Sequence, residues 1–324
     1  MLKLKTWISA FRLRTLPLAV SGIITGAGLA GIHHSLNIRI TFLCLLTAVA
    51  LQILSNLAND YGDFMKGTDT EKRIGNQRAL QSGNISPKQM FSMIIFFVLV
   101  CLVSGIYLLT LSTGGKINLP FLLFFITGIL AIAAALKYTI GKNAYGYSGL
   151  GDIAVFVFFG WVAVAGTFLL NSHFEFYEDI DFIIFFPASA IGFLCTAVLN
   201  TNNIRDMEND RASGKHTIPV KIGLERARNY HTFLIGSAFL FFFIYDFLIS
   251  FDWIQLLQIP ASYFILKNLL AVQRTEPSAQ YNSLLKQLSL GTFLFVIFFI
   301  FTNAFPRFLH LVSTLIYVLK NLAG

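Results

Sequence analysis

Long apolar segments, separated by short polar ones, follow one another along almost the whole chain. Nine of them are close to the ~20 residues that an α-helix needs to cross a bilayer. They cover approximately residues 16–33, 40–60, 90–112, 118–137, 150–170, 182–203, 229–250, 253–272 and 286–305. The pattern predicts an all-α polytopic membrane protein in which residues 1–324 form a single domain with nine transmembrane helices.

The last stretch, residues 306–324, is apolar but short, and it contains Arg307, His310 and Lys320. Helices with an apolar face and scattered charges tend to lie in the membrane interface. We therefore expect an interfacial C-terminal segment here, with a tenth span as the alternative.

The composition supports lipid as the surroundings and argues against nucleic acid as a partner. Hydrophobic residues make up 56% of the chain and charged residues only 12%, against about a quarter in soluble domains. The net charge of +8 would suit nucleic acid. However, the basic residues lie in short loops between apolar segments, which is the pattern of membrane topology. No obligate protein partner is evident.

The distribution of basic residues predicts an orientation. With nine spans and a cytoplasmic N-terminus, all but four of the 24 Lys and Arg residues fall in cytoplasmic segments. The four on the outer side are Arg39, Lys116, Arg307 and Lys320. Such an excess of positive charge on one side favours a cytoplasmic N-terminus.

Acidic residues preceded by asparagine mark the ends of the second and sixth predicted helices. In the first group, Asn56, Asn59, Asp60 and Asp63 are three or four residues apart and share one helix face. In the second group, Asn202, Asp206 and Asp210 recur every fourth residue. Both groups fall on the predicted cytoplasmic side.

These groups point to a divalent metal ion. Carboxylates one helical turn apart repel each other, and the low dielectric near lipid increases the cost. Oxygen ligands of this type suit Mg²⁺, which combines one or two carboxylates with substrate phosphates. We therefore predict Mg²⁺ as the cofactor and a diphosphate as part of the substrate. The alternative is a solvated helix end whose acids pair with Lys66, Arg205 and Arg211.

Basic residues near each group are candidates for binding phosphate oxygens. Arg78 is preferred in the first loop and Lys215 in the second, and Arg14 is a further candidate. Arg12 is expected instead to extend to the membrane interface. Membrane topology alone also explains basic residues in these loops. The residues predicted to bind substrate are Asn56, Asn59, Arg14, Lys66, Arg78, Asn202, Arg205 and Lys215.

A third polar segment joins the fourth and fifth predicted helices. It contains Tyr138 and a glycine-rich stretch that ends at Asp152. Glycines let the backbone approach a ligand closely. An alternative explanation is an acidic residue that stabilises a helix N-terminus, next to tyrosines at the membrane interface.

Several motifs resemble the UbiA superfamily of intramembrane prenyltransferases. Asn59 and Asp63 fit its first motif, Asn-x-x-x-Asp-x-x-x-Asp, and Asp206 and Asp210 fit its second, Asp-x-x-x-Asp. At the third position of the first motif the chain has glycine, and an acid follows two residues later as Asp69.

That departure is itself similar to one branch of the superfamily, the 1,4-dihydroxy-2-naphthoate polyprenyltransferases of menaquinone synthesis. So are Arg-x-Arg-Thr-Leu-Pro near the N-terminus and Arg-Ala-Leu-Gln-Ser-Gly at 78–83. The segments at 138–152 and 202–215 are similar too. The resemblance extends from about residue 12 to residue 223.

The resemblance implies nine helices around a central cavity and Mg²⁺-dependent transfer of a polyprenyl group from polyprenyl diphosphate to an aromatic acceptor. The expected acceptor is 1,4-dihydroxy-2-naphthoate, which loses its carboxyl group and yields demethylmenaquinone. The expected location is the bacterial inner membrane. Together with the acidic groups, the resemblance implies a list of metal ligands: Asp60, Asp63, Asp69, Asp206 and Asp210. Asp152 and Tyr138 are expected to bind or polarise the acceptor.

Two alternatives remain open at this point. A sister enzyme would prenylate another ring, such as 4-hydroxybenzoate or homogentisate. A membrane transporter would use acids near the bilayer midplane to relay ions, but here both acidic groups lie at one face.

Overall fold

Helices are the regular secondary structure of the computed structural model, which describes residues 2–68, 78–174, 182–249 and 251–322. Each of the nine predicted segments overlaps a helix or a run of shorter helices. These are α2 (Leu16–Ile32), α3 (Ile38–Met65), α4 (Pro87–Ser112), α5 (Leu119–Lys137), α6 (Gly151–Val155) with the π-helix η3 (Phe156–Ala165) and α7 (Gly166–Asn171), α8 (Phe185–Arg205), α11 (Leu224–Ile249), α12 (Gln258–Ala261) with α13 (Tyr263–Arg274), and α14 (Tyr281–Leu322).

The prediction of nine transmembrane spans is not confirmed. Among the described residues, six helices are long and apolar enough to cross a membrane. A seventh span is possible if α1 (Leu2–Phe11) and α2 are one span with a 53° bend. Neither α8 nor α13 meets the same criteria of length and apolarity. The α8 segment ends in Asn-Thr-Asn-Asn-Ile-Arg, and these polar residues lower its hydropathy.

Local sequence signals explain where the helices begin. The Ser86 hydroxyl accepts a hydrogen bond from the Gln89 backbone N–H, and the Gln89 side chain accepts one from the Ser86 N–H. This capping box precedes α4, with Pro87 at its first position. Asn118 caps α5 in a similar way through the Phe121 N–H. Each cap satisfies donors that a helix leaves free at its start.

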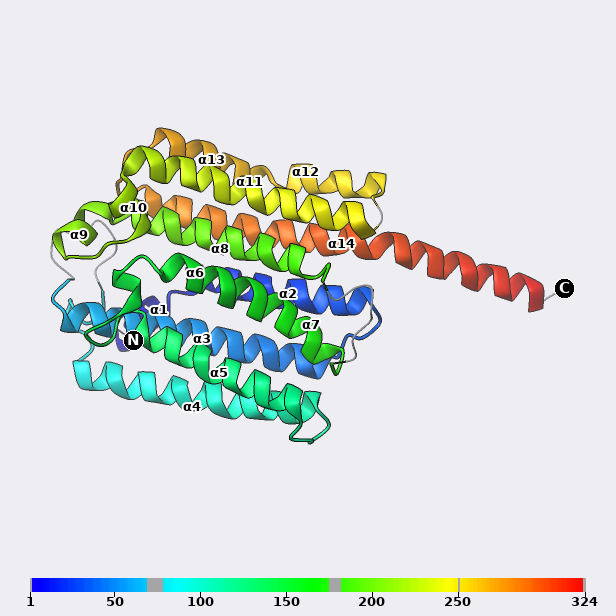
Figure 1. Ribbon diagram of the computed structural model, residues 1–324, viewed down its shortest axis with the longest axis horizontal. Helices are drawn as coiled ribbons and strands as arrows, with labels where there is room; N and C mark the ends of the chain where they lie inside the picture. Colours follow the sequence, from blue (N-terminus) through cyan, green and yellow to red (C-terminus); the bar gives the residue numbers. More distant parts are fainter. Residues whose placement is uncertain (1, 69–77, 175–181, 250, 323–324) are drawn as a thin grey trace.

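The helices form an elongated bundle (Figure 1). In that view, α4 and α5 lie at one edge and α13 at the other. Along α8, sixteen residues are buried, while α5 contains none, so α8 lies in the core and α5 at the periphery. The last turns of α3 and α8 lie at the same end of the bundle as α9 (Met207–Ala212) and α10 (Ile218–Ile222). Both acidic groups are therefore at one end.

A ten-residue π-helix, η3, is an unusual feature of the bundle, because π-helical turns are rare and often occur at functional sites. Glycines in η3 and in a neighbouring helix let it pack closely. A Cβ atom on Gly26 of α2 would lie 2.3 Å from the Val164 carbonyl oxygen. One on Gly160 of η3 would lie 2.6 Å from the Ala188 carbonyl oxygen. Backbone-to-backbone packing therefore holds one wall of the bundle.

The Gly26→Ala variant is expected to lower stability by about 1–3 kcal/mol, because the added methyl group forces α2 away from η3. Gly236→Ala on α11 is the matched control, since nothing lies within 4 Å of a Cβ there, and alanine favours the helix by about 0.5–1 kcal/mol. Thermal unfolding in detergent measures both. Equal midpoints for the two variants would contradict the packing argument.

The C-terminal residues continue α14 past Pro306 as far as Leu322. This part of the helix projects beyond the far end of the bundle, away from α9 (Figure 1). The interfacial position expected for residues 306–324 stays a prediction.

Candidate active site

A cavity of about 400 Å³ connects the two acidic groups. Asp63 at the end of α3 lines it together with Asp206 and Asp210, which follow α8. All three carboxylates are buried, with 2–7% of their surface exposed. Residues nearly 150 positions apart in the sequence therefore face the same space at the same end of the bundle.

Three side chains bind the carboxylate of Asp63. Arg78 Nη1 lies 2.7 Å from Oδ2. Lys215 Nζ lies 2.8 Å from Oδ1, and the Tyr147 hydroxyl donates to the same oxygen at 2.8 Å. Lys215 belongs to the loop after α9, so the charge pair joins the two acidic groups across the cavity.

Asp60 pairs with Arg12 and with Arg78, whose Nε lies 3.3 Å from Oδ1. The prediction that Arg12 extends to the membrane interface is therefore wrong. Arg12 directly follows α1 and adopts the left-handed conformation, with φ of 51°, which few residues other than glycine adopt. The chain bends there between α1 and α2, and this turn places the guanidinium over Asp60.

In the second group, both oxygens of Asp206 accept hydrogen bonds from Arg205, at 2.8 and 2.6 Å. The Arg205 side chain is 1% exposed and also donates to Asn202 and Asn282. Arg205 was predicted to bind substrate, but it does not line the cavity. It instead holds the carboxylate of Asp206 through two hydrogen bonds. Asn202 does line the cavity.

The balance of charge differs from what the sequence suggested. Asp60, Asp63 and Asp206 pair with arginine and lysine side chains, so the expectation that a metal must neutralise these acids is supported only in part. A buried ion pair is nevertheless costly to desolvate and adds little stability. A concentration of such pairs around a cavity is more typical of a functional site.

The oxygen donors around the cavity suit Mg²⁺. The Oδ1 atom of Asn59 is buried and has no hydrogen-bond partner in the described part of the chain, and its residue lines the cavity beside Asp63. Within residues 2–68 and the later described segments, no three acidic, His or Cys side chains are close enough to hold a metal alone.

Three loops meet at Tyr147. Its ring faces the Lys66 ammonium group, with Nζ 3.8 Å from the ring centroid, and Lys215 lies 4.8 Å away. Its hydroxyl also lies 3.3 Å from the Thr68 hydroxyl, and its carbonyl oxygen accepts the His216 N–H at 2.9 Å. Burial raises the pKa of Tyr147 above the usual range, and the charge of Asp63 raises it further, so the phenol stays protonated.

Tyr138 and Asp152 occupy different positions relative to the cavity. Tyr138 lines it, whereas Asp152 lies outside the lining residues and accepts a hydrogen bond of 3.2 Å from Tyr230. Tyr138 packs against Gly151, where a Cβ would lie 3.0 Å from the phenol oxygen. Burial raises the pKa of Tyr138, with a further contribution from Asp152, so Tyr138 remains a hydrogen-bond donor at neutral pH.

The other predicted residues are placed as follows. Arg78 and Lys215 line the cavity. Asn56 lines it and donates to the Phe11 carbonyl oxygen at 3.1 Å. Lys66 is exposed and reaches Tyr147 rather than the cavity.

Two predicted residues cannot be placed in the same way. Asp69 lies outside the described residues. Arg14 belongs to the turn Leu13–Thr15, and its side chain is outside the described part of the structure.

Arg12 and Tyr147 belong to this site but were not predicted from the sequence. Arg12 is two residues from the candidate Arg14, and nothing in the local pattern shows that the helix ends there. Tyr147 lies in the glycine-rich segment that ends at Asp152, but its spacing gives no sign of contact with Asp63.

Residues 19–291 match the sequence pattern of the UbiA prenyltransferase family. A 1,4-dihydroxy-2-naphthoate octaprenyltransferase of Haemophilus influenzae is 40% identical over 299 residues, which are 92% of this chain and 95% of that protein. A protein of Escherichia coli with the same name is 44% identical over 72% of this chain and 74% of that protein.

The fold is also similar to a solved structure, a UbiA homolog from Archaeoglobus fulgidus bound to DMAPP and Mg²⁺. The TM-score is 0.61 at 18% identity, over 92% of this chain and 99% of that one. With its long apolar helices, the chain is an integral membrane protein. The family match over most of its length and the 40% identical relative show that the chain belongs to the UbiA prenyltransferase family.

Proposed function

We propose that this enzyme transfers a polyprenyl group from polyprenyl diphosphate to 1,4-dihydroxy-2-naphthoate, with loss of carbon dioxide, as a step of menaquinone synthesis. In this proposal the whole chain forms one domain with nine spans in the bacterial inner membrane. The active site faces the cytoplasm, as the excess of basic residues on that side supports.

One observation carries the proposal. The carboxylates of Asp63, Asp206 and Asp210, from two distant parts of the chain, line a cavity whose remaining lining is mostly apolar. A polar end beside an apolar channel suits a substrate with a charged diphosphate and a long hydrocarbon tail. The relatives named as 1,4-dihydroxy-2-naphthoate octaprenyltransferases support the same substrate class.

The diphosphate is held by cations that line this end of the cavity. Arg78 and Lys215 both line it and carry N–H donors that suit phosphate oxygens. These donors pair with Asp63, which keeps them in place. Asp63, Asp206, Asp210 and Asn59 are the residues proposed to hold Mg²⁺, and Asp69 is a further candidate from the sequence. When bound, Mg²⁺ supplies positive charge to the diphosphate.

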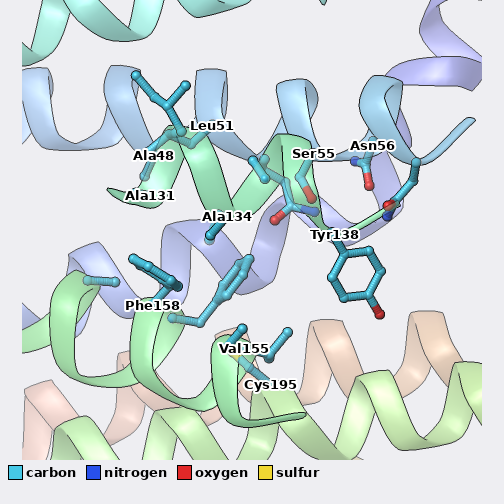
Figure 2. Close-up of a pocket in the computed structure, with 18 of the residues that line it drawn as sticks. Ala48, Leu51, Ser55, Asn56, Ala131, Ala134, Tyr138, Val155, Phe158 and Cys195 are labelled. Atoms are coloured by element: carbon cyan, nitrogen blue, oxygen red, sulfur yellow. The ribbon is translucent and has the colours of Figure 1, made fainter. Parts of the chain in front are cut away.

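The reaction breaks the bond between the first prenyl carbon and the diphosphate oxygen, and the diphosphate leaves with the electron pair. Arg78 and Lys215 stabilise the negative charge that grows on the departing group. A carbon–carbon bond forms between the allylic carbon and the electron-rich naphthol ring, which then loses carbon dioxide. Tyr138 lines the cavity near this end and Phe158 lines it farther along (Figure 2). Aromatic faces stabilise a transient cation.

The acceptor is proposed to lie beside Tyr138, whose protonated phenol can donate a hydrogen bond to it. Asp152 acts indirectly in this proposal: it lies near Tyr138 but outside the cavity lining.

The proposal is tested by supplying purified protein with labelled prenyl diphosphate and one acceptor at a time: 1,4-dihydroxy-2-naphthoate, 4-hydroxybenzoate or homogentisate. Mass spectrometry is expected to show a prenylated, decarboxylated product from the naphthoate alone. A product from another ring alone would identify a sister prenyltransferase. Uptake into proteoliposomes with no product from any acceptor would support a transporter.

The Tyr147→Phe variant is expected to raise the Mg²⁺ concentration that gives half-maximal turnover by about 10–100-fold. The reason is that the hydroxyl group orients a proposed metal ligand, and such supporting contacts contribute about that much. Titration of activity with Mg²⁺ measures the shift in half-saturation. Tyr107→Phe is the matched control, because Tyr107 is exposed on α4. If Tyr147→Phe responds to Mg²⁺ like the control, Tyr147 does not orient a metal ligand.

A further inference from the structure

Arg205 carries a buried positive charge whose partners determine where its guanidinium lies. It is the last residue of α8, and its side chain is 1% exposed. The guanidinium donates to both oxygens of Asp206. It also donates to the side-chain oxygens of Asn202, at 2.9 Å, and of Asn282, at 2.8 Å. A buried charge needs such partners, so these three residues together fix the position of the guanidinium.

A break between α8 and α9 lets Arg205 bind the residue that follows it. Consecutive residues do not face each other along a helix. Asp206 lies at the break, with φ of −94° and ψ of 6°, a sparsely populated region of backbone conformation that is common in active sites. There its carboxylate can turn back to the guanidinium. Because Asp206 lines the cavity, the two hydrogen bonds from Arg205 set the direction in which this carboxylate faces the site.

Asn282 connects Arg205 to a distant part of the chain. Asp206 and Asn202 are within three positions of Arg205, whereas Asn282 is 77 residues away, in the first turn of α14. This helix runs beside α8 (Figure 1). Asn282 is partly buried and does not line the cavity. Its contact with Arg205 is therefore a support from outside the site.

The first turn of α14 is itself held in place. The Tyr281 hydroxyl donates to the Thr275 carbonyl oxygen at 3.0 Å. On α13, the buried amide of Asn268 donates to the Leu284 carbonyl oxygen at 2.9 Å. Tyr281 and Leu284 also pack with Ile204, at the end of α8, in one hydrophobic cluster. Buried hydrogen bonds of this kind make a structure rigid, so the turn offers its side chains as fixed anchors.

We propose that Asn282 is a positioning residue for the metal site. By holding the guanidinium of Arg205, it fixes the direction in which Asp206 presents its carboxylate to Mg²⁺ and the diphosphate. The inference rests on the proposed function, in which Asp206 is a metal ligand. Asn282 touches neither metal nor substrate and acts through Arg205. The start of α14 thereby supports the active site, although no sequence motif points to it.

The test measures, by calorimetry and without an acceptor, the Mg²⁺ concentration that gives half-maximal binding of geranyl diphosphate. Asn282→Leu replaces the oxygen that accepts from Arg205 with an apolar group of similar size. We expect it to raise this Mg²⁺ concentration about tenfold, the lower end of the effect of contacts that orient a metal ligand. Asn282→Asp keeps an oxygen at the same position, so its value should lie closer to the wild type than to Asn282→Leu.

Asn268→Leu is the matched control, because Asn268 is a buried asparagine that holds the same turn of α14. Its hydrogen bonds go to His231 and to Leu284, not to Arg205. This variant should lower the midpoint of thermal unfolding in detergent and leave the half-saturating Mg²⁺ concentration near the wild-type value. A merely structural role for Asn282 would instead shift both variants alike.

A second comparison places Asn282→Leu in the Asp206→Asn background. If Asn282 acts through Asp206, the added substitution should weaken binding of geranyl diphosphate by much less than it does in the wild type, because residues of one network are not additive. If Asn282→Leu does not fold, Asn282→Ala takes its place in both comparisons, and the same results are required.

The positioning role is overturned if Asn282→Leu keeps the wild-type half-saturation, if Asn268→Leu shifts it equally, or if the effect is undiminished in Asp206→Asn. It is also overturned if the wild type binds geranyl diphosphate without any dependence on Mg²⁺. Failure of the proposed function gives a different result, in which the wild type forms no naphthoate product. The expected order of variants in donor binding would then still support the role of Asn282, because no acceptor takes part in that measurement.

Discussion

The Asp63→Asn variant is expected to lose at least about 10²–10³-fold in turnover, the usual effect of removing one preorganised charged group from a reacting site. Asp63 is the residue on which Arg78, Lys215 and Tyr147 converge. Asparagine keeps the shape of the side chain but removes its charge. The variant therefore loses a proposed metal ligand and the anchor of both phosphate-binding cations.

The stability of Asp63→Asn must be measured separately, because removing one partner of a buried ion pair leaves uncompensated charge and costs about 3–5 kcal/mol. Asp246→Asn is the matched control. Asp246 is also a buried carboxylate, 3% exposed, and accepts from Gln258 and Asn303 far from the acidic end. Turnover per folded molecule should stay near wild type in Asp246→Asn. Normal turnover in Asp63→Asn would exclude Asp63 from the metal site.

Removal of divalent metal is expected to have an equally large effect. Treatment with EDTA should reduce turnover more than about 100-fold, because a metal contributes several kcal/mol to stabilising charge in the transition state. Added Mg²⁺ should restore activity. Ca²⁺ should restore much less, since it prefers more ligands at longer distances.

The reason for this dependence lies in the charges of the cavity. Asp60, Asp63, Asp206 and their basic partners already balance approximately, so a diphosphate that enters alone would bring excess negative charge. A diphosphate that enters with Mg²⁺ would not. An enzyme whose turnover is insensitive to the chelator would contradict this account and would favour binding by arginine and lysine alone.

The positions of the helices were largely predictable from the sequence, because apolar segments of the right length need no tertiary information. The span count was not. The segment predicted as the sixth span, α8, carries polar residues near its end, and α8 is not among the six described helices that are long and apolar enough to cross a membrane. The π-helix was also unpredictable, since its close packing depends on Gly26 of α2 and Gly160 of η3, whose contacts form only in the folded chain.

In the candidate site, most of the residues expected on one face of α3 do line the cavity, but Asp60, expected on that face and as a metal ligand, does not. Helical periodicity places Asn59 and Asp63 on the cavity side. Contacts between helices could not be read in the same way. Arg12 reaches Asp60 only because the chain bends between α1 and α2. Arg205 looked like a phosphate ligand because it is basic, yet its guanidinium is buried against Asp206.

The central claim is that carboxylates from two separate helices act on one bound diphosphate and metal. It is tested most directly by calorimetry of geranyl diphosphate with Mg²⁺, using the wild type, Asp63→Asn, Asp210→Asn and the double variant. The account predicts that each single variant binds more weakly and that the double variant loses less than the sum, because both residues serve one site. Losses that simply add, or wild-type affinity in either single variant, would contradict it.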